Sequence, residues 1–434
     1  MFRLAGALLA GLVTGLPALA QVRAGGEFRV NSATTGTQRT PAVAMGADGG
    51  FLVVWTVPDD GSSLGLGGQA FAADGRPLGA EFQVNAFTSG IQLRPAVAAS
   101  PRGGFVVAWQ SEGQDGSGFA AVAALFDGQG RRRGAEFVLN SITTGQQFGP
   151  RIGVDAAGRF VAVWSEDGRD GSLSGIVGRR FDAAGSPLGA EFVVNTWTLH
   201  LQIGPVVAVA PDGRFVVSWD SYEQDGDDWG VFAQRYSPSA ARLGFEFRVN
   251  STVTGPQFGY GVAGDAAGGF VVTWVSPDGQ DGDRAGVFAQ RYTPSGVRSG
   301  SEFQVNVFSQ GNQRRASAGS DAAGNFVVAW QADYQDGYWI GITGARFDRE
   351  GLRREPEFVV NTYTTSFQTY AAAASDASGN VVVVWESVTP AAEIDVFAQR
   401  FGGLHAQALA LDTAAGPASD GNRVLEPGES VDVL

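Results

Sequence analysis

The 434-residue sequence contains no cysteine, and no lysine among its 30 basic residues. Without cysteine, the chain has no disulfide framework, no thiolate metal site and no cysteine for a lipid anchor. Histidine occurs only twice, at His200 and His405. With only two histidines, a histidine-rich metal site or a histidine-based catalytic triad is nearly excluded.

Basic charge and long apolar runs are also scarce. The formal net charge is −14, which predicts that the protein repels nucleic acid and anionic membranes. Only the N-terminus is strongly apolar: a positive Met1–Arg3 start and an apolar stretch lead to Ala18-Leu19-Ala20. We interpret residues 1–20 as a signal peptide rather than a buried helix, with no membrane insertion elsewhere. The sequence therefore predicts an exported protein, secreted or at the cell surface, with the periplasm as an alternative.

Seven tryptophans recur at an almost fixed interval. Consecutive gaps are 54, 55, 55, 55, 56 and 55 residues, and each tryptophan ends an apolar run. A fixed period indicates one supersecondary unit that is copied and stacked. The positions are Trp55, Trp109, Trp164, Trp219, Trp274, Trp330 and Trp385.

Each repeat predicts four short β-strands. Strand A follows the pattern Pro-x-Val-Ala, strand B ends in tryptophan, strand C reads Val-Phe-Ala-Gln-Arg, and strand D reads Glu-Phe-x-Val-Asn. A four-stranded unit repeated radially predicts an all-β, seven-bladed β-propeller over residues 22–403. Because the mature chain starts with a lone strand D at 27–31 and its last copy ends after strand C, we expect the N-terminal strand to complete the last blade.

The C-terminal segment 404–434 departs from the repeat. It contains a turn-forming stretch, Asp420-Gly421-Asn422, followed by a short apolar run. It is either a tail or the truncated start of a β-sandwich module.

Taken together, the repeated motifs resemble those of a class of bacterial secreted and surface proteins with W-x-S…DG…GVFAQRF…EFxVN repeats. The resemblance covers essentially the whole mature chain and implies an exported propeller. It brings no catalytic residues. The seventh copy departs from the pattern, because residues 386–395 contain no Asp-Gly pair.

Residues repeated in every copy are interpreted as structural, so a binding site is expected where the repeat is broken. The repeated Asn of strand D and Gln before strand A are expected to satisfy backbone groups, and the tryptophans to wedge between blades. The departures are aromatic side chains and one histidine in loops D–A and B–C, which open on one face of a propeller. Exposed aromatics in such loops are typical of a contact surface, although packing over loop residues is the alternative. The candidate ligand-binding residues are Trp197, His200, Tyr222, Trp229, Tyr334, Tyr338 and Trp339.

The B–C loops are also acidic. Oxygen ligands in an exported protein suit Ca²⁺, and Asp225, Asp227 and Asp228 form the strongest candidate site. The alternative is that the Asp-Gly pairs are ordinary turns.

These observations favour a monomeric, non-enzymatic binding or adhesion module that contacts carbohydrate or protein through the D–A/B–C face. The alternative is a carbohydrate-active enzyme, a glycoside hydrolase or polysaccharide lyase, using carboxylates on the same face. No residue is assigned a catalytic role.

Overall fold

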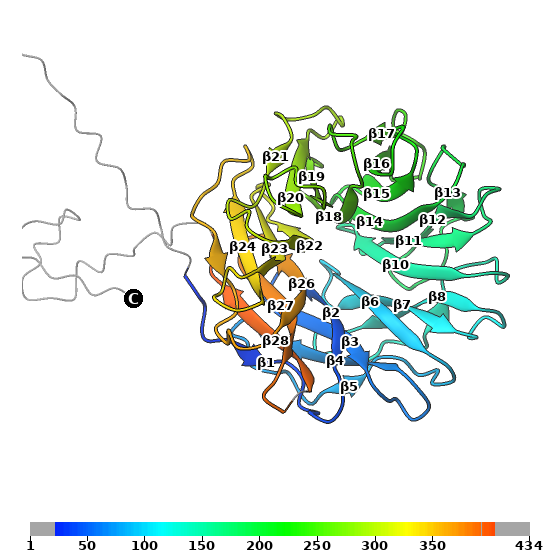
Figure 1. Cartoon of the computed structure of the whole chain (residues 1–434). Helices are drawn as coiled ribbons and strands as arrows, with labels where there is room; N and C mark the ends of the chain where they lie inside the picture. The colour runs from blue at the N-terminus through cyan, green and yellow to red at the C-terminus, as the bar shows by residue number, and fades with distance from the viewer. Residues whose placement is uncertain (1–21, 392, 404–434) are drawn as a thin grey trace, which may run out of the picture.

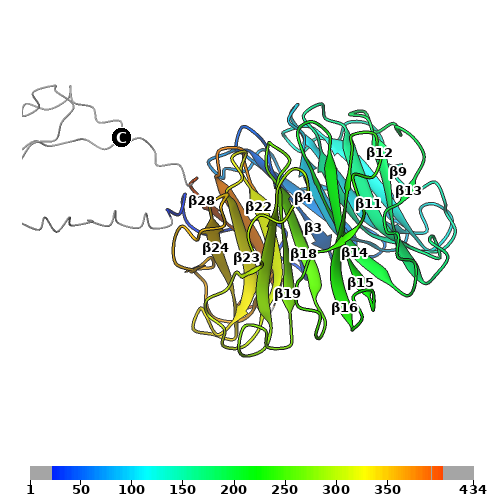
Figure 2. The ribbon, with the colours of Figure 1, turned by 90° about the horizontal axis from the view of Figure 1, so that it is seen from above.

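The structure is a computed structural model that describes residues 22–391 and 393–403. These residues form seven four-stranded antiparallel sheets arranged in a ring (Figure 1). Seen from the side, the sheets stand next to one another around the ring (Figure 2). The predicted seven-bladed all-β propeller is therefore confirmed. The predicted signal peptide, 1–20, and the segment 404–434 lie outside the described residues.

The blades follow the chain in order, and each has its A strand nearest the centre. They are blade 1, β2 (Arg39–Met45), β3 (Phe51–Val57), β4 (Gly65–Phe71) and β5 (Phe82–Gln83); blade 2, β6 (Gln92–Ala99), β7 (Phe105–Glu112), β8 (Phe119–Phe126) and β9 (Phe137–Val138); blade 3, β10 (Gln147–Val154), β11 (Phe160–Asp167), β12 (Ser174–Phe181) and β13 (Phe192–Val193); blade 4, β14 (Gln202–Val209), β15 (Phe215–Tyr222), β16 (Trp229–Tyr236) and β17 (Phe247–Arg248); blade 5, β18 (Phe258–Gly264), β19 (Phe270–Ser276), β20 (Gly286–Tyr292) and β21 (Phe303–Gln304); blade 6, β22 (Gln313–Ser320), β23 (Phe326–Asp333), β24 (Ile340–Phe347) and β25 (Phe358–Val359); and blade 7, β26 (Gln368–Ser375), β27 (Val381–Val388), β28 (Ile394–Phe401) and β1 (Phe28–Arg29).

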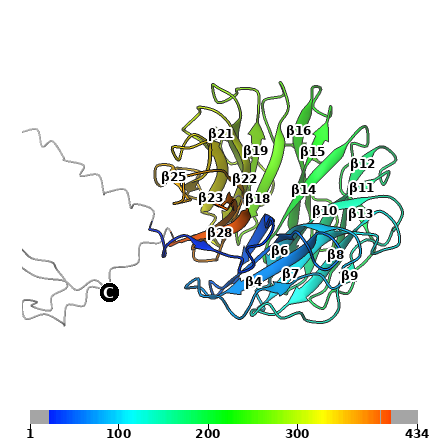
Figure 3. The same ribbon diagram turned by 60° about the horizontal axis from the view of Figure 1, so that its bottom comes forward.

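The N-terminal strand β1 completes blade 7. It pairs antiparallel with β28, with Phe28 opposite Ala398 and Arg29 opposite Phe397. Figures 1 and 3 show this blue strand beside the orange-red end of the propeller. The first and last strands that the structure describes thus close the ring, as the order of the sequence pieces predicts.

Apolar cores lie between adjacent blades, and one tryptophan lies in each. Trp330 of blade 6, for example, packs with Val275 and Ala289 of blade 5, and Trp55 packs with Val382 and Val384 across the closure. All seven tryptophans are fully buried. Since burying a large aromatic side chain contributes several kcal/mol, these seams supply much of the stabilisation that holds blade to blade.

A repeated polar clasp fixes the end of each strand D. The Asn306 amide donates to Asp281 in the B–C loop (2.8 Å) and to Gln313 of the next strand A (3.3 Å), while its oxygen accepts from Val287 N (2.8 Å). The asparagine is buried. The structural interpretation of the repeated asparagines is confirmed, because the side chain satisfies groups that would otherwise be buried without partners.

The glutamate that begins each strand D links neighbouring blades. The Glu81 carboxylate accepts from the backbone N–H of Ser32 (2.6 Å) and of Ala33 (3.2 Å). Glu27 makes the equivalent bonds to Thr362 and Tyr363 at the closure. The closing seam therefore has the same link as the others.

Blade 7 keeps the clasp with a residue from a different position. In blade 5 the loop aspartate Asp281 sits over Gly286, where a Cβ would lie 2.6 Å from its side chain. Blade 7 lacks that loop aspartate and has Asp395 on β28 in the glycine's place, opposite Ser387. Asp395 accepts from Asn31 at 2.7 Å. The missing Asp-Gly pair is thus compensated within the strand.

Within the described residues, no helix is long and apolar enough to cross a membrane.

Candidate functional site

Backbone outliers mark one face of the ring. Among the described residues, nine non-glycine residues have positive φ. All but one of them lie on the D–A/B–C face: they occur in its loops or at the loop-proximal ends of the A strands. Such residues cost about 1–3 kcal/mol each and cluster at functional sites. They are Thr40, Arg94, His200, Glu223, Arg315, Tyr334, Ser366 and Tyr370, with Ala240 on the other face.

In the loops of this face, the outliers replace glycines of the repeat. His200 (φ 65°) occupies the D–A position that is Gly145 (φ 88°) one blade earlier. Glu223 (φ 59°) and Tyr334 (φ 66°) occupy the B–C position that is Gly168 (φ 69°) in blade 3. A left-handed conformation is easy for glycine and unfavourable for other residues. Blades 4 and 6 therefore depart from the repeat at a local energetic cost.

The predicted residues of blade 4 form one aromatic chain. The His200 ring lies edge-on to Tyr222, with centroids 5.9 Å apart, and Tyr222 lies 5.2 Å from Trp229. Phe258, at the start of the next blade, extends the chain at 6.0 Å from Trp229. Three of the predicted residues are thus brought together; they and Phe258 are called the blade-4 aromatic cluster below.

A carboxylate orients the histidine of this cluster. His200 Nε2 lies 3.2 Å from Glu223 Oε2, and both side chains are about half exposed, at 46% and 48%. The same carboxylate raises the pKa of the Tyr222 hydroxyl. The two left-handed residues of blade 4 therefore act on each other and on the tyrosine between them.

The predicted residues of blade 6 form a second, smaller group. Tyr334 and Trp339 lie 6.3 Å apart and, with Tyr338, are exposed. In the described residues, no aromatic contact joins this group to the blade-4 aromatic cluster. The candidate ligand-binding residues of blades 4 and 6 therefore form two groups rather than one continuous surface.

Trp197 stands apart from both groups. Its side chain is only partly exposed and makes no ring contact within the described part of the chain. Its backbone N–H donates to Glu246 at 3.2 Å and its carbonyl accepts from Asn195 at 2.8 Å. Trp197 thus contributes to the loop that carries His200.

The aspartates of the predicted calcium site have partners within the chain. Asp225 lies 3.4 Å from the Asn250 amide of its own clasp, and Asp227 accepts from Gly255 N at 3.0 Å. Through residues 22–391 and 393–403, no group of three or more His, Cys, Asp or Glu side chains is arranged to hold a metal ion. The calcium prediction stays untested, with Asp225 acting as a structural residue.

A cavity of about 720 Å³ occupies the mouth of the central channel on the same face. Its wall is formed by the first halves of all seven A strands, each of which carries a bulge two to three residues after its glutamine. At the position two residues after the glutamine, blades 3 to 5 have glycine and the other four blades have a side chain. They are Thr40, Arg94, Gly149, Gly204, Gly259, Arg315 and Tyr370.

Charged and phenolic groups collect in this cavity, and the sequence analysis assigned them no role. Arg94, Arg151 and Arg315 line it, as do Tyr260 and Tyr370. The Arg315 guanidinium lies 3.9 Å from the centroid of the Tyr370 ring. Burial, and next the charge of Arg94, lowers the pKa of Arg151. When the copies are aligned at the glutamine, Arg94, Arg315 and Tyr370 share one variable position, whereas Tyr260 and Arg151 lie further along their strands.

Two buried carboxylates tie this wall together. Asp220 Oδ1 accepts from Gly259 N at 2.6 Å, and Glu386 Oε1 accepts from Thr40 N at 2.6 Å, each across a blade seam. Burial raises the pKa of Asp220 well above its usual range and also raises that of Glu386. Asp220 faces the cavity.

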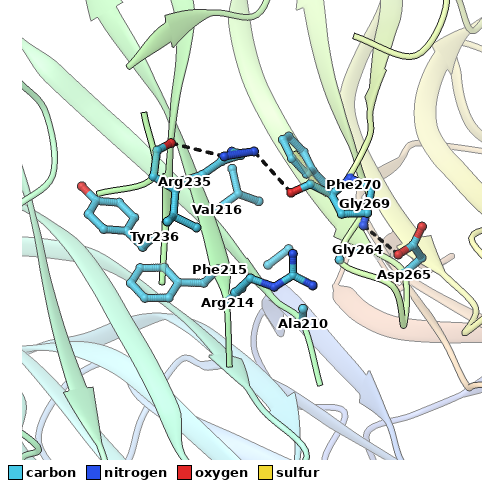
Figure 4. A pocket seen from close by; sticks show the side chains of 14 residues that line it. Ala210, Arg214, Phe215, Val216, Arg235, Tyr236, Gly264, Asp265, Gly269 and Phe270 are labelled. Carbon is cyan, nitrogen blue, oxygen red and sulfur yellow. Dashed lines mark hydrogen bonds between the residues drawn. The ribbon is translucent and has the colours of Figure 1, made fainter. Parts of the chain in front are cut away.

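A smaller pocket on the opposite face differs in kind. It lies in the seam between blades 4 and 5 and holds only about 30 Å³. Figure 4 shows the Arg235 guanidinium across it, donating to Leu243 O in its own blade and to Pro294 O in the next at 3.2–3.3 Å. Its size admits about one water, and its arginine is satisfied within the chain.

No family model matches the chain, and no curated protein matches it in sequence. Solved structures match in fold. A protein of unknown function from Dyadobacter fermentans is 11% identical and has a TM-score of 0.54, with 89% of this chain and 100% of that chain covered. The β-propeller domain of the Trilobed protease from Pyrococcus furiosus is 9% identical at a TM-score of 0.49, over 84% and 93%. The α-L-arabinanase of Penicillium chrysogenum is 11% identical at a TM-score of 0.49, over 87% and 98%. At such identities the likeness concerns the fold alone.

Proposed function

We propose that this protein is an exported, non-catalytic binding module that receives carbohydrate on the blade-4 aromatic cluster. One observation carries the proposal: His200 and Glu223 hold left-handed conformations at positions that blade 3 fills with glycine, and Glu223 lies beside both the histidine and the tyrosine of the cluster. A strained residue at a position where glycine would be unstrained indicates that the side chain has a role other than stabilising the fold.

The chemistry of the cluster suits a sugar. A row of aromatic rings offers apolar faces, while His200, Glu223 and the loop aspartates offer hydrogen-bonding groups beside them. Partly exposed aromatic residues of this kind are enriched at contact surfaces. Export follows from the predicted signal peptide and is part of the same proposal.

The test is binding of the full chain to a panel of neutral and acidic glycans, measured by thermal shift and calorimetry. Trp229→Ala and Tyr222→Ala are expected to weaken binding at least about tenfold. Phe245→Ala is the matched control, because Phe245 is 94% exposed in a loop of the opposite face. Equal loss in the control, or unchanged binding in both cluster variants, would rule out this site. Binding to no glycan would redirect the search to protein ligands.

We also propose that calcium binds at Asp225, Asp227 and Asp228, and this proposal has a separate test. If calcium binds there, the melting temperature falls in chelator, and Asp228→Asn removes that difference. An identical melting temperature with calcium and with chelator would contradict the site.

A second candidate, glycoside hydrolysis, is favoured by Asp220. A carboxyl group that faces a cavity and has a raised pKa has the property of a general acid. Release of reducing ends from a polysaccharide, abolished in Asp220→Asn, would establish the enzyme. Saturable binding without product would leave the binding module.

A further inference from the structure

We propose that the mouth of the central channel is a second site, for a carboxylate-bearing sugar, bound by Arg94, Arg151 and Arg315. It lies on the same face as the blade-4 aromatic cluster, and Phe258 of that cluster also lines the cavity. The three arginines do not belong to the cluster, and Trp229 and Tyr222 do not line the cavity, so the two sites can be tested separately.

The three arginines reach one cavity from three blades. Arg94 lies on β6, Arg151 on β10 and Arg315 on β22, and all three line the space of about 720 Å³. Pockets of this size accommodate small ligands. The whole chain carries a net charge of −14, so this cationic lining is a local exception.

These arginines have no carboxylate partner. Over the part of the chain that the structure describes, none of the three lies within ion-pair distance of an acidic side chain; Arg151 donates only to the carbonyl of Pro150, at 3.1 Å. By contrast, the buried Arg346 of blade 6 has a carboxylate partner, with its Nε 3.8 Å from Glu355 Oε1. Arg151 and Arg315 are partly buried and Arg94 is exposed. Guanidinium groups gathered in one cavity without a counter-charge favour an incoming anion. The neighbouring charge of Arg94, which adds to the lowering of the pKa of Arg151, acts in the same direction.

The backbone is strained at two of these three arginines. Arg94 (φ 55°) and Arg315 (φ 53°) hold left-handed conformations at the bulge position that blades 3 and 4 fill with Gly149 and Gly204. The bulge itself accepts glycine, so the arginines are not needed to form it. Their retention therefore points to what their side chains bind.

The carboxylates nearby do not neutralise the site. Asp220 and Glu386 each use an oxygen to accept a backbone N–H across a seam, and neither lies within ion-pair distance of the three arginines. Tyr260 and Tyr370 line the cavity together with the arginines, and the Arg315 guanidinium lies over the Tyr370 ring. The two oxygens of a carboxylate match the planar fork of a guanidinium, and the tyrosines add aromatic surface and hydroxyl groups for an attached sugar ring.

The experiment is calorimetric titration of the full chain with galacturonate and glucuronate, their neutral methyl esters, and sulfate. We expect both uronates to bind, the esters to bind at least about tenfold more weakly, and sulfate not to compete. Arg94→Gly and Arg315→Gly should each weaken uronate binding at least about tenfold. These two variants place glycine where other blades already have it, so they should fold and melt no lower than the parent protein.

Two controls keep the outcome specific. Arg76→Gln removes an exposed arginine on the opposite face and should leave uronate binding unchanged, and so should Trp229→Ala in the blade-4 aromatic cluster. Equal binding of uronates and their esters, full competition by sulfate, or unchanged binding in both arginine variants would overturn the proposal. Loss of binding in Trp229→Ala would assign the uronate to the other site.

Discussion

The two faces of the ring are built from the same blades but use them differently. On the A–B/C–D face, the turns repeat closely, and arginines such as Arg180 and Arg235 donate to carbonyls of the next blade. Of the residues that the structure describes on that face, Ala240 is the only non-glycine residue with positive φ. On the D–A/B–C face, the repeated clasps coexist with eight such residues and with the aromatic and cationic groups. Since the blade cores constrain both faces equally, the irregular face is where the chain departs from the most stable form of its repeat.

Removing one clasp should produce the largest difference in stability between variants of the two faces. Asn306→Ala removes the hydrogen bonds to Asp281 Oδ2 and Gln313 Oε1 and the acceptor of the buried Val287 N–H, at an expected cost of about 3 kcal/mol in unfolding free energy. Arg235→Gln on the other face removes only bonds to carbonyls near the surface and should cost less than about 1 kcal/mol. Urea denaturation measures both. Equal costs would remove the energetic distinction between the faces.

The pH dependence of stability should have opposite signs on the two faces. Burial raises the folded-state pKa of Asp220, so the folded protein keeps a proton that the unfolded chain releases, and stability falls as pH rises through that window. Asp220→Asn should therefore melt higher than the parent at neutral pH, with the difference shrinking toward acid pH below the unfolded-state pKa. At Asp212, on the other face, slight burial acts upward but hydrogen bonds from Arg214 lower the pKa overall. That contribution is present at neutral pH and is lost on acidification through the folded-state pKa.

Melting curves of the parent, Asp220→Asn and Asp212→Asn between acid and neutral pH measure the two effects. The Asp212→Asn change should be the smaller, because that carboxylate is half exposed and well screened. A parent-like pH profile for Asp220→Asn would contradict the assignment of a raised pKa to that group.

The links around the irregular face should be equal at the closure and within the ring. Glu27→Ala removes bonds to Thr362 and Tyr363, and Glu81→Ala removes matching bonds to Ser32 and Ala33. Each should cost about 1–2 kcal/mol in equilibrium unfolding. A much smaller loss for Glu27→Ala would show that the closing seam is open in solution.

The smallest effect should be a gain in stability. Glu223→Gly and Ala240→Gly each relieve a left-handed residue and should raise the unfolding free energy by roughly 0.5–1 kcal/mol, after the added flexibility of the unfolded chain is counted. Only Glu223→Gly should also weaken glycan binding, because His200 then loses its partner. Calorimetric melting and glycan titration check the pair. Weaker binding in Ala240→Gly would contradict the functional difference between the faces.

Much of the fold was predictable because each repeated residue has one role that recurs. The tryptophan spacing predicts the seven seams, and the lone strand D at 27–31 predicts the closure. The structural role of the loop aspartates was not predictable, because the sequence does not show that Asp225 faces Asn250 from 25 positions away. The equivalence of Asp395 with the loop aspartates was hidden for the same reason.

The candidate site was predictable only in part. His200, Tyr222 and Trp229 were found because they interrupt a repeat, and the structure brings them together. The blade-6 residues interrupt it equally well yet form a separate group, since blade 5 lies between. Arg94 and Arg315 also break the repeat, but their significance depends on Arg151, which lies in a different position of its strand.

The sequence by itself determined the period, the strand order and the closure, because hydrophobic patterning and turn residues act over a few positions and repeat seven times. Only the tertiary structure decided which departures meet. Closing the ring places the first halves of seven A strands around one cavity, so side chains more than two hundred residues apart line the same space. These side chains meet because of the curvature of the ring and the burial of its strands, and neither can be predicted from a single repeat.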